Sequence, residues 1–509
     1  MEKLLLDGSS LTIEDFISVT RGMRKVGLTD ASKQAVLKAR ELVDRFVSEH
    51  RVVYGLTTGF GKFSDVSIDQ DETEALQRNL ITSHCCGVGE PFPADIVRGI
   101  ILLRVNALSK GFSGIRLETL ESLIGMLNEN VVPYVPEKGS LGASGDLAPL
   151  SHVALTLIGQ GQAYYQGELM DGAEAMKKAG VPIITLSSKE GLALNNGTQV
   201  MTSVGTHTIW DAFNLIRQAN GIAMLSFEAL TGITDAYFEG THKIRNQAGQ
   251  VSCAKNFLEL VEGSANTTKQ GELRVQDAYS LRCLPQIHGA SLDCFNYVRS
   301  KVENEINAVT DNPIIFVDEE RVVSGGNFHG QPMALPFDFL KIGLAELANV
   351  SERRVERLVN PALSNGLPAF LTERGGVNSG FMIVQYSAAS LVSENKVLAH
   401  PASVDSIPSS ANQEDHVSMG TIAARQAREI LGNTRKVLAM ELLTACQALD
   451  LRGNKGLGKG TQAFYDKARS VVDTLGEDRV MYYDIDKMEK LIESNELVKA
   501  LDELQITLN

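Results

Sequence analysis

The stretch FDFLKIGLAELANVSERRVERL, Phe337–Leu358, decides the fold class of this chain. Its apolar residues recur at the spacing that places side chains on one face of a helix. The residues on that face are Phe337, Leu340, Leu344, Leu347, Val350 and Leu358. The pattern stops before Pro361, a residue that interrupts helices. The spacing therefore predicts a long helix with one buried face.

Comparable patterns lie on the C-terminal side of this stretch. Residues 437–449 are apolar on nearly all sides, which predicts a helix buried in a bundle or an oligomer core. Residues 386–399 predict a third helix. We therefore predict a mainly α protein with two regions, a loop-rich N-terminal region over 1–199 and a long central helical bundle over 200–509.

The N-terminal region alternates helical patterns with loops. Helices are expected over 31–50, 96–108 and 117–127. Glycine-rich or Asn-Gly stretches predict loops, among them YGLTTGFGKFSD, which holds Tyr54, and KEGLALNNGTQ. Strand signals are few, and NPIIFVD with RVVSGG predicts one small hairpin near residue 320.

Composition excludes several classes of protein. The 509 residues include 48 Lys and Arg against 62 Asp and Glu, a net charge of −14, and no basic tract marks a nucleic-acid or anionic-membrane surface. The six cysteines form no CxxC pair, so zinc ribbons are unsupported and free thiols in a reducing compartment are expected. No apolar run has the length of a membrane span, and MEKLLLDGSS is too short for a signal peptide. We expect a cytoplasmic protein with no nucleic-acid or membrane partner.

The stretch GSLGASGDLAPLSH, Gly139–His152, admits three interpretations. It reads as a flexible turn, or as a nucleophilic serine, although G-x-S-x-G requires glycine where Asp146 stands. The third is a backbone cyclisation in which the nitrogen of Gly145 attacks the carbonyl of Ala143 and Ser144 loses its hydroxyl as water. Glycine suits the attacking position because it has no Cβ. Spacing alone does not choose among the three.

The wider sequence resembles the aromatic amino acid ammonia-lyase family. Ordered matches run through GSLGASGDLAPLSH, YGLTTGFGKFSD, LITSHCCGVGEPF, KEGLALNNGTQ, VQDAYSLRCLPQIHG, TDNPIIF, SGGNFHG, SERRVERL, GFMIVQYSAASLVSENK and NQEDHVSMG. The resemblance implies a fumarase/aspartase-like helical fold and a homotetramer whose active sites are built by several subunits. It also implies a methylidene-imidazolone formed autocatalytically from Ala143, Ser144 and Gly145, with no external cofactor and no metal.

Two positions bear on the substrate. The chain has Ser83-His84 where tyrosine- and phenylalanine-specific relatives carry His-Leu or Phe-Leu, and Glu414 where those relatives resemble NQDV. Both features are typical of the histidine-specific branch, whose reaction converts L-histidine into trans-urocanate and ammonia. An imidazole needs hydrogen-bond partners that His84 and Glu414 provide. The alternatives are a structural histidine and a cap or ion-pair glutamate, and for the whole chain a tyrosine or phenylalanine lyase, an aminomutase or an inactive helical scaffold.

The resemblance also assigns roles to further residues. Arg282 grips the substrate carboxylate, Tyr279 transfers a proton, and Gln276 shares their face if the segment is helical. Tyr54 matches the general base, in a loop suited to a lid. Structural alternatives are an aromatic core residue for Tyr279 and a salt bridge for Arg282.

Four more residues complete the predicted site. Asn196 is expected to hydrogen-bond the imidazolone oxygen, although an Asn-Gly turn explains it equally, and Asn195 stands where relatives place an aliphatic residue. Asn312 would hold the carboxylate or a structural water, and Phe328 would wall the pocket. Asp146 either orients the cyclising backbone or caps the following helix. No metal-binding spacing such as HExxH is present.

Overall fold

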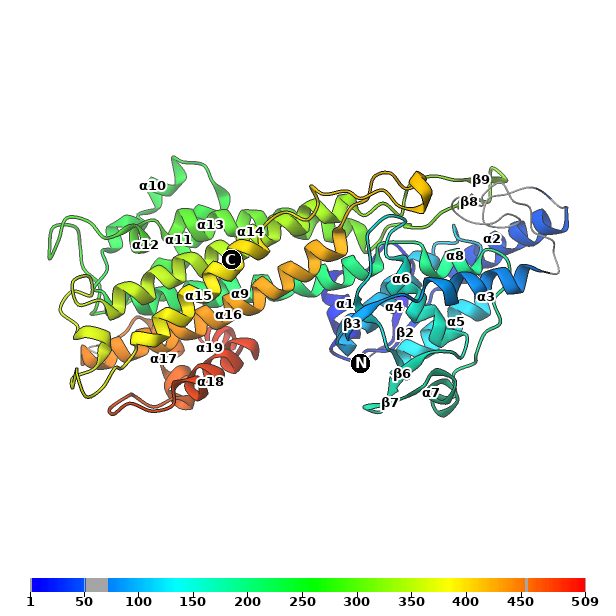
Figure 1. Cartoon of the computed structure of the whole chain (residues 1–509). Helices are drawn as coiled ribbons and strands as arrows, with labels where there is room; N and C mark the ends of the chain where they lie inside the picture. The colour runs from blue at the N-terminus through cyan, green and yellow to red at the C-terminus, as the bar shows by residue number, and fades with distance from the viewer. Residues whose placement is uncertain (1, 50, 52–71, 454–455, 509) are drawn as a thin grey trace. The chain divides into compact units, whose positions relative to one another are not determined.

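The structure is a computed structural model that describes residues 2–49, 51, 72–453 and 456–508. Its described part contains nineteen α-helices and strands of only two to four residues (Figure 1). The prediction of a mainly α protein is therefore confirmed. Within these residues, no helix combines the length and the apolar character needed to cross a membrane.

The chain divides into two compact units, each assembled from three stretches of sequence. The first comprises residues 1–207, 299–338 and 401–425, and the second comprises residues 208–298, 339–400 and 426–509. Four of the five boundaries fall inside helices, namely α9 (Gln199–Ala229), α13 (Leu284–Glu305), α14 (Gln331–Val359) and α16 (Gly420–Leu451). The sequence analysis divides the chain into two contiguous regions, 1–199 and 200–509, and this division stays a prediction.

The long helices predicted from periodicity are present, and they begin earlier than predicted. Helix α14 starts at Gln331, α15 is Met382–Leu398, and α16 starts at Gly420. In α14 the cause is Pro336, which lies inside the helix. Proline lacks an N–H donor but has a φ that suits a helix near its start, so the helix extends through it.

The first unit surrounds a buried helix with other helices and small sheets. Helix α4 (Ala94–Leu108) is buried along almost its whole length and packs against α1 (Ile13–Thr20) and α5 (Leu117–Asn128). The other helices of this unit are α2 (Asp30–Ser48), α3 (Thr73–His84), α6 (Leu147–Leu157), α7 (Gly172–Ala179) and α8 (Glu190–Asn195). Its strands are β1 (Leu4–Leu6), β2 (Val26–Leu28), β3 (Val88–Pro91), β4 (Val132–Pro133), β5 (Pro136–Lys138), β6 (Gln162–Tyr165), β7 (Glu168–Asp171), β8 (Ile314–Phe316) and β9 (Arg321–Val323).

The predicted hairpin is confirmed. Strands β8 and β9 pair antiparallel, with Ile315 opposite Val322. The inward side chain of Ile315 is fully buried and packs with Leu42, Val43 and Phe46 of α2. This contact joins the segment around residue 315 to the N-terminal stretch of the same unit.

The stretch KEGLALNNGTQ, predicted as a loop, is partly helical. Residues Glu190–Asn195 form helix α8. Glu190 is fully buried, and its carboxylate accepts hydrogen bonds from the Arg116 side chain (Nε at 3.0 Å) and from the Ser187 backbone N–H at 2.8 Å. The loop prediction was wrong here because the long-range contact from Arg116 holds a short helix that local sequence does not favour.

The second unit is a bundle of helices joined by buried polar contacts. Its remaining elements are α10 (Glu239–Lys243), α11 (Ala248–Leu260), α12 (Tyr279–Arg282), α13 (Leu284–Glu305), α17 (Lys459–Val471), α18 (Met481–Glu493) and α19 (Glu496–Glu503). Glu441 of α16 accepts hydrogen bonds from Ser226 of α9 and from Ser351 and Arg354 of α14. All four side chains are fully buried. These contacts fix the lateral positions of three long helices in this unit.

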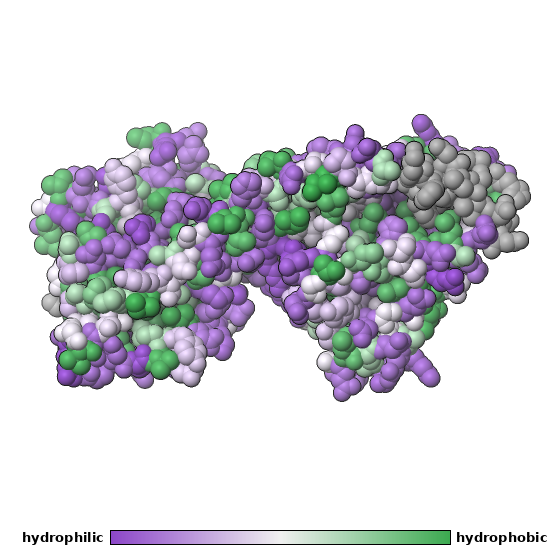
Figure 2. Space-filling model, viewed as in Figure 1, coloured by the Kyte–Doolittle hydropathy of each residue, from purple (hydrophilic) through white to green (hydrophobic). Residues whose placement is uncertain are grey.

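The surface mixes polar and apolar residues. On the face in Figure 2, hydrophilic residues predominate and hydrophobic residues form small separate areas. Helix α15 exposes three large apolar side chains: Ile383 at 57%, Tyr386 at 60% and Val397 at 68%. Exposed apolar side chains on one helix are typical of a surface that another chain covers.

Candidate active site

Three helices of the first unit bring predicted site residues together. Helices α3, α6 and α8 pack against one another. His84 is the last residue of α3, Asp146 directly precedes α6, and Asn196 directly follows α8. The Gly191 N–H of α8 donates to the side chain of Gln77 in α3 at 2.7 Å, a contact between two buried residues. Residues distant in sequence therefore converge at the ends of these helices.

The Ala-Ser-Gly turn is packed tightly against the segment that follows α8. Gly145 has φ of +77° and forms a bridge with Gly197. A Cβ on Gly145 would lie 2.2 Å from the backbone oxygen of Gly197, so no side chain fits there. Ala143 is 8% exposed and packs with Val417 and Met419. The turn is thus clamped on both sides.

Asp146 fastens this turn to the start of α9. Its carboxylate accepts hydrogen bonds from the backbone N–H groups of Val200 at 3.0 Å and Met201 at 2.9 Å, in the first turn of that helix. Ser140 and Thr421 donate to the same carboxylate. Burial raises the pKa of Asp146, and these hydrogen bonds oppose the rise. The side chain makes no capping bond to α6, the helix that it precedes.

Ser144 points to Glu414. Its hydroxyl donates to Glu414 Oε1 at 2.7 Å, and Ser409 donates to Glu414 Oε2 at 3.0 Å. Ser410, Ala411 and Asn412, just before Glu414, all have positive φ, between 51° and 68°. Non-glycine residues in this region cost energy, and such strain is typical of functional loops. The loop therefore presents Glu414 at the serine of the turn.

His84 lies within electrostatic range of Glu414. Its side chain is half-buried, and its Nδ1 is 3.0 Å from Ser83 Oγ. Burial lowers the pKa of His84, and the Glu414 carboxylate opposes this effect. A neutral imidazole beside a carboxylate offers both a donor and an acceptor to a small polar ligand.

Asn196 is held by its backbone, and its side-chain oxygen has no partner. Its carbonyl accepts a hydrogen bond from Arg104 at 2.8 Å. The Oδ1 atom is buried without any hydrogen-bond partner in the described structure. Neighbouring Asn195 is also buried, and its side-chain amide donates a hydrogen bond to the Ser151 hydroxyl at 3.1 Å.

Asn312 and Phe328 lie in the same unit. Asn312 accepts a hydrogen bond from the Gly325 N–H at 2.7 Å and donates to Ser324 at 3.3 Å, so its side chain fastens the loop that leads to Phe328. Phe328 is half-buried. Their contact with a substrate stays a prediction.

Three predicted residues belong to the second unit. Tyr279 and Arg282 are the ends of the one-turn helix α12, with the Arg282 guanidinium carbon 4.6 Å from the Tyr279 ring centroid. Tyr279 is 67% exposed, and the Nε atom of Arg282 is buried without a partner in the described residues. Gln276 precedes the helix, so the expected common helical face holds for Tyr279 and Arg282 only.

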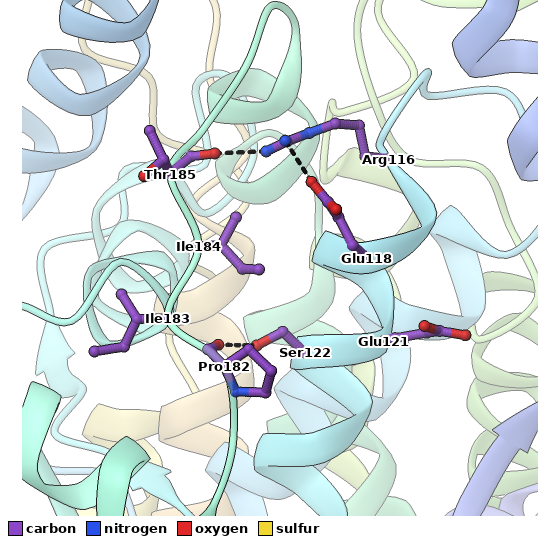
Figure 3. Close-up of a pocket in the computed structure, with 8 residues that line it drawn as sticks. All are labelled: Arg116, Glu118, Glu121, Ser122, Pro182, Ile183, Ile184 and Thr185. Carbon is purple, nitrogen blue, oxygen red and sulfur yellow. Dashed lines mark hydrogen bonds and ion pairs between the residues drawn. The ribbon is translucent and has the colours of Figure 1, made fainter.

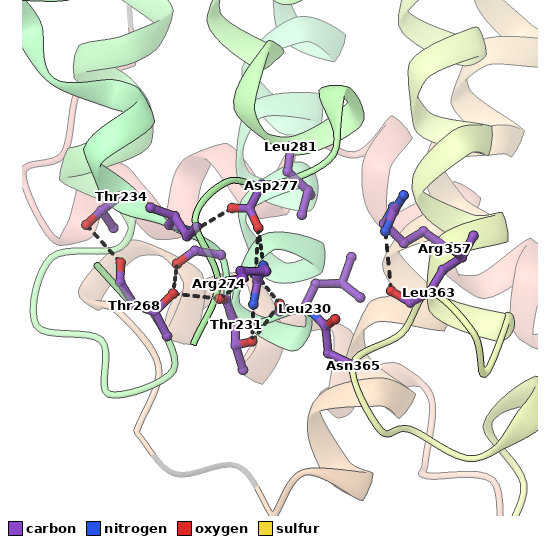
Figure 4. Close-up of polar contacts among 12 residues, drawn as sticks. Leu230, Thr231, Thr234, Thr268, Arg274, Asp277, Leu281, Arg357, Leu363 and Asn365 are labelled. Carbon is purple, nitrogen blue, oxygen red and sulfur yellow. Dashed lines mark hydrogen bonds and ion pairs between the residues drawn. The ribbon is translucent and has the colours of Figure 1, made fainter. Parts of the chain in front are cut away.

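The segment that carries these three residues is anchored by an ion pair (Figure 4). Asp277 is 5% exposed, accepts from the Ile233 N–H at 2.6 Å and pairs with Arg274. Arg274 in turn donates to the carbonyls of Leu230 at 2.9 Å and Thr231 at 2.8 Å, just beyond α9. The anchor fixes the approach of the chain to α12.

Comparison with known proteins identifies the family. A family profile described as aromatic amino acid lyase matches residues 11–470. The chain is also 63% identical over 502 residues to a histidine ammonia-lyase from Alkaliphilus oremlandii, covering 99% of each. The chain belongs to the aromatic amino acid lyase family. The predictions of the family and of a carbon–nitrogen lyase are confirmed.

Two solved structures of aromatic amino acid lyase relatives share the fold. Histidine ammonia-lyase from Trypanosoma cruzi superposes with a TM-score of 0.92 at 41% identity, covering 99% of this chain and 95% of that one. Tyrosine aminomutase from Streptomyces globisporus superposes with a TM-score of 0.96 at 38% identity, covering 100% of both. The fold class is therefore confirmed by structure.

The residues of this lyase fit the methylidene-imidazolone that the resemblance implies. Gly145 has no room for a side chain, and Ala143 is small and enclosed. The buried Oδ1 of Asn196 is held by no hydrogen bond among the described residues, so the side-chain amide can turn its NH2 group toward a further acceptor. Within the residues described, no three His, Cys, Asp or Glu side chains assemble as a metal-ion site requires.

A surface pocket of about 520 Å³ in the first unit of the lyase is separate from these residues (Figure 3). Arg116, at its edge, donates to the Thr185 carbonyl and pairs with Glu118, and Ser122 donates to the Pro182 carbonyl at 2.6 Å. None of the predicted site residues that the structure describes lines it. Its Arg116, Glu118 and Ser122 side chains pair within the chain, so we assign it no role in the lyase reaction.

One predicted residue of the lyase cannot be placed, and three residues were not predicted from the sequence. Tyr54 lies outside the described residues. Sequence reasoning missed Arg104 and the Arg274–Asp277 pair. A signal for Arg104 exists, because Arg98 and Arg104 interrupt an otherwise apolar helix, whereas nothing local distinguishes Asp277 from its neighbours.

Proposed function

We propose that this lyase removes ammonia from L-histidine to give trans-urocanate. The observation that carries the proposal is the polar group at the turn, where Glu414 accepts from Ser144 at 2.7 Å and acts electrostatically on His84. An apolar pocket would leave the nitrogens of a substrate imidazole unpaired, which is costly in a buried site. In this site the carboxylate of Glu414 and the imidazole of His84 would be the hydrogen-bond partners of those nitrogens. The 63% identical relative named histidine ammonia-lyase supports the same substrate.

The prosthetic group belongs to the same proposal. We infer that Ala143, Ser144 and Gly145 cyclise to a methylidene-imidazolone, with Asn196 donating to its oxygen. When formed, this group supplies the electrophile that the elimination of ammonia requires. The packing of Gly145 against Gly197 supports the cyclisation, because it holds the turn bent.

The other residues would bind and orient the substrate. Arg282 carries a planar guanidinium suited to the substrate carboxylate, and Asn312 and Gln276 would support that end. Tyr279 and Tyr54 are the candidates for moving a proton, and Phe328 would wall the site. Glu414 and His84 would hold the imidazole and exclude aromatic substrates without ring nitrogens.

We also propose a cytoplasmic homotetramer with sites built by several subunits. In such an assembly Tyr279 and Arg282 need not come from the chain that supplies Ser144. The exposed apolar side chains of α15 and the six free cysteines are in keeping with an oligomer in a reducing compartment. Light scattering of the purified protein tests the assembly, and a monomer would contradict it.

Two measurements test the function. Purified protein is incubated with L-histidine, L-tyrosine or L-phenylalanine while urocanate, coumarate and cinnamate absorbances are followed. We expect urocanate alone, whereas preference for tyrosine or phenylalanine, or accumulation of a β-amino acid, would contradict the substrate. Intact mass should be lower than the sequence mass by two water molecules per chain, and an unshifted mass would contradict the prosthetic group.

A further inference from the structure

Arg104 is a buried cation directly beneath the turn that carries Asn196. It lies in α4, is 2% exposed, and donates to the backbone carbonyls of Ala193 at 2.7 Å and Asn196 at 2.8 Å. It also donates to the Thr310 carbonyl at 3.3 Å and to Gln199 Oε1 at 2.9 Å. One guanidinium thus holds the end of α8, the start of α9 and the segment before Asn312.

The turn that Arg104 holds is the one that presses on Gly145. A Cβ on Gly197 would lie 2.5 Å from Arg104 Nη1, so the guanidinium and this glycine are in direct contact. The Gly197 carbonyl accepts from the Asp146 N–H at 2.7 Å and lies against Gly145. Contact therefore runs without a gap from Arg104 through Gly197 to the attacking residue of the Ala-Ser-Gly turn.

Arg104 shares its surroundings with a second buried cation, Lys189. Lys189 donates to Asp311 at 2.8 Å, and both side chains are at most 2% exposed. Arg104 Nη2 lies 4.0 Å from Asp311 and has no hydrogen-bond partner among the described residues. Two buried cations thus face one carboxylate.

We propose that Arg104 is a positioning residue for the cyclisation of Ala143, Ser144 and Gly145, a role that rests on the proposed function. In that reaction the Gly145 nitrogen bonds to the Ala143 carbonyl carbon, whose oxygen leaves as water with the amide protons of Gly145 and Ser144. The Ser144 hydroxyl leaves as a second water with the Cα proton, so no oxidant is needed. Arg104 holds Gly197 against Gly145 and thereby keeps the attacking nitrogen close to the carbonyl.

Helix α4 offers a matched control in Arg98. Arg98 is 3% exposed and, like Arg104, donates to three backbone carbonyls and one side-chain amide oxygen. Burial lowers the pKa of both guanidinium groups to about 10. The partners of Arg98 are Val19, Thr20, Leu127 and Asn130, none of which belongs to the site. The two arginines thus have similar solvent exposure but hold different segments of the chain.

The test compares Arg104→Lys with Arg98→Lys in the full chain. Lysine keeps the charge but loses the planar fork that reaches several carbonyls. Intact mass is followed from synthesis onward, and thermal unfolding is recorded for each variant. We expect the form lighter by two waters to accumulate about tenfold or more slowly in Arg104→Lys, because small misplacements of reacting groups cost rate heavily. Arg98→Lys should mature at the wild-type rate with a comparable loss of thermal stability.

Three results would overturn the proposal. The first is maturation of Arg104→Lys at the wild-type rate, and the second is an equal slowing of maturation in Arg98→Lys. If Arg104→Lys does not fold, Gln199→Leu takes its place, because it removes one acceptor of Arg104. The third result is then maturation of Gln199→Leu at the wild-type rate. The failure of the proposed function looks different, because the wild-type chain itself would then keep its full sequence mass.

Discussion

At the scale of single residues, substitution of Glu414 gives the most direct test of the proposed substrate. We expect Glu414→Gln to lower kcat/KM for L-histidine about 10- to 100-fold, since hydrogen bonds to charged groups contribute about 1.5–3 kcal/mol. Ser409→Ala is the control, because it removes only the donor to Glu414 Oε2. Steady-state kinetics measure both, and equal losses would show that the loop rather than the carboxylate matters.

His84 should leave a signature in the pH dependence of stability. Burial lowers its pKa in the folded protein below the usual 6.5, so below that pH the unfolded chain takes up the proton more readily. The folded state therefore loses stability as pH falls through 6.5. The thermal midpoint of wild type minus that of His84→Gln should be constant at pH 7.5 to 8.5 and should decrease as pH falls toward 5. Parallel profiles would contradict the buried neutral imidazole.

The hydrogen-bond partners of Asp146 could not be identified from its position in the sequence. Position alone suggested a cap for α6, and the residue does occupy that place. Its carboxylate instead accepts from Val200 and Met201 at the start of α9, more than fifty positions away in the chain. A capping pattern identifies a polar side chain near a helix start but cannot identify which helix start it reaches.

At the scale of elements, the Arg274–Asp277 anchor should control the approach to α12. We expect Asp277→Ala to lower kcat/KM about tenfold, mainly through KM, because Arg282 would lose its fixed position relative to the substrate carboxylate. The neighbouring Asp235→Ala is the control, since Asp235 accepts from the Gln270 N–H at an exposed site. Asp277→Asn should recover part of the activity by keeping an acceptor for Ile233. If Asp277→Ala has unchanged kinetics, the Arg274–Asp277 pair does not contribute to positioning Arg282.

Elements also differ in how well periodicity predicts them. Helix α14 is long, its apolar face is regular, and it is present where the pattern places it. Helix α8 has six residues and forms because Arg116 and Ser187 satisfy the buried Glu190. Short helices have unfavourable nucleation, so contacts from elsewhere decide whether they exist.

At the scale of the whole molecule, Glu441 links three long helices of the second unit. Glu441→Gln should destabilise the chain by about 3–5 kcal/mol, because it leaves Arg354 as a buried cation without its carboxylate. The double variant Glu441→Leu with Arg354→Met should lose less stability than Glu441→Gln, since neither charge remains. Denaturant unfolding followed by circular dichroism measures both. A double variant that is less stable than the single one would contradict this account.

The sequence by itself determined the fold class and the family, and it predicts the chemistry of the turn. Regular apolar spacing reports a helix directly, and ordered motifs such as NQEDHVSMG identify the family over most of the chain. Only the tertiary structure decided that Ser144 meets Glu414, that Asp146 caps α9, and that Arg104 supports the turn at Gly197. These pairings join residues far apart along the chain. Periodicity and motifs describe neighbours in sequence, whereas packing determines neighbours in space.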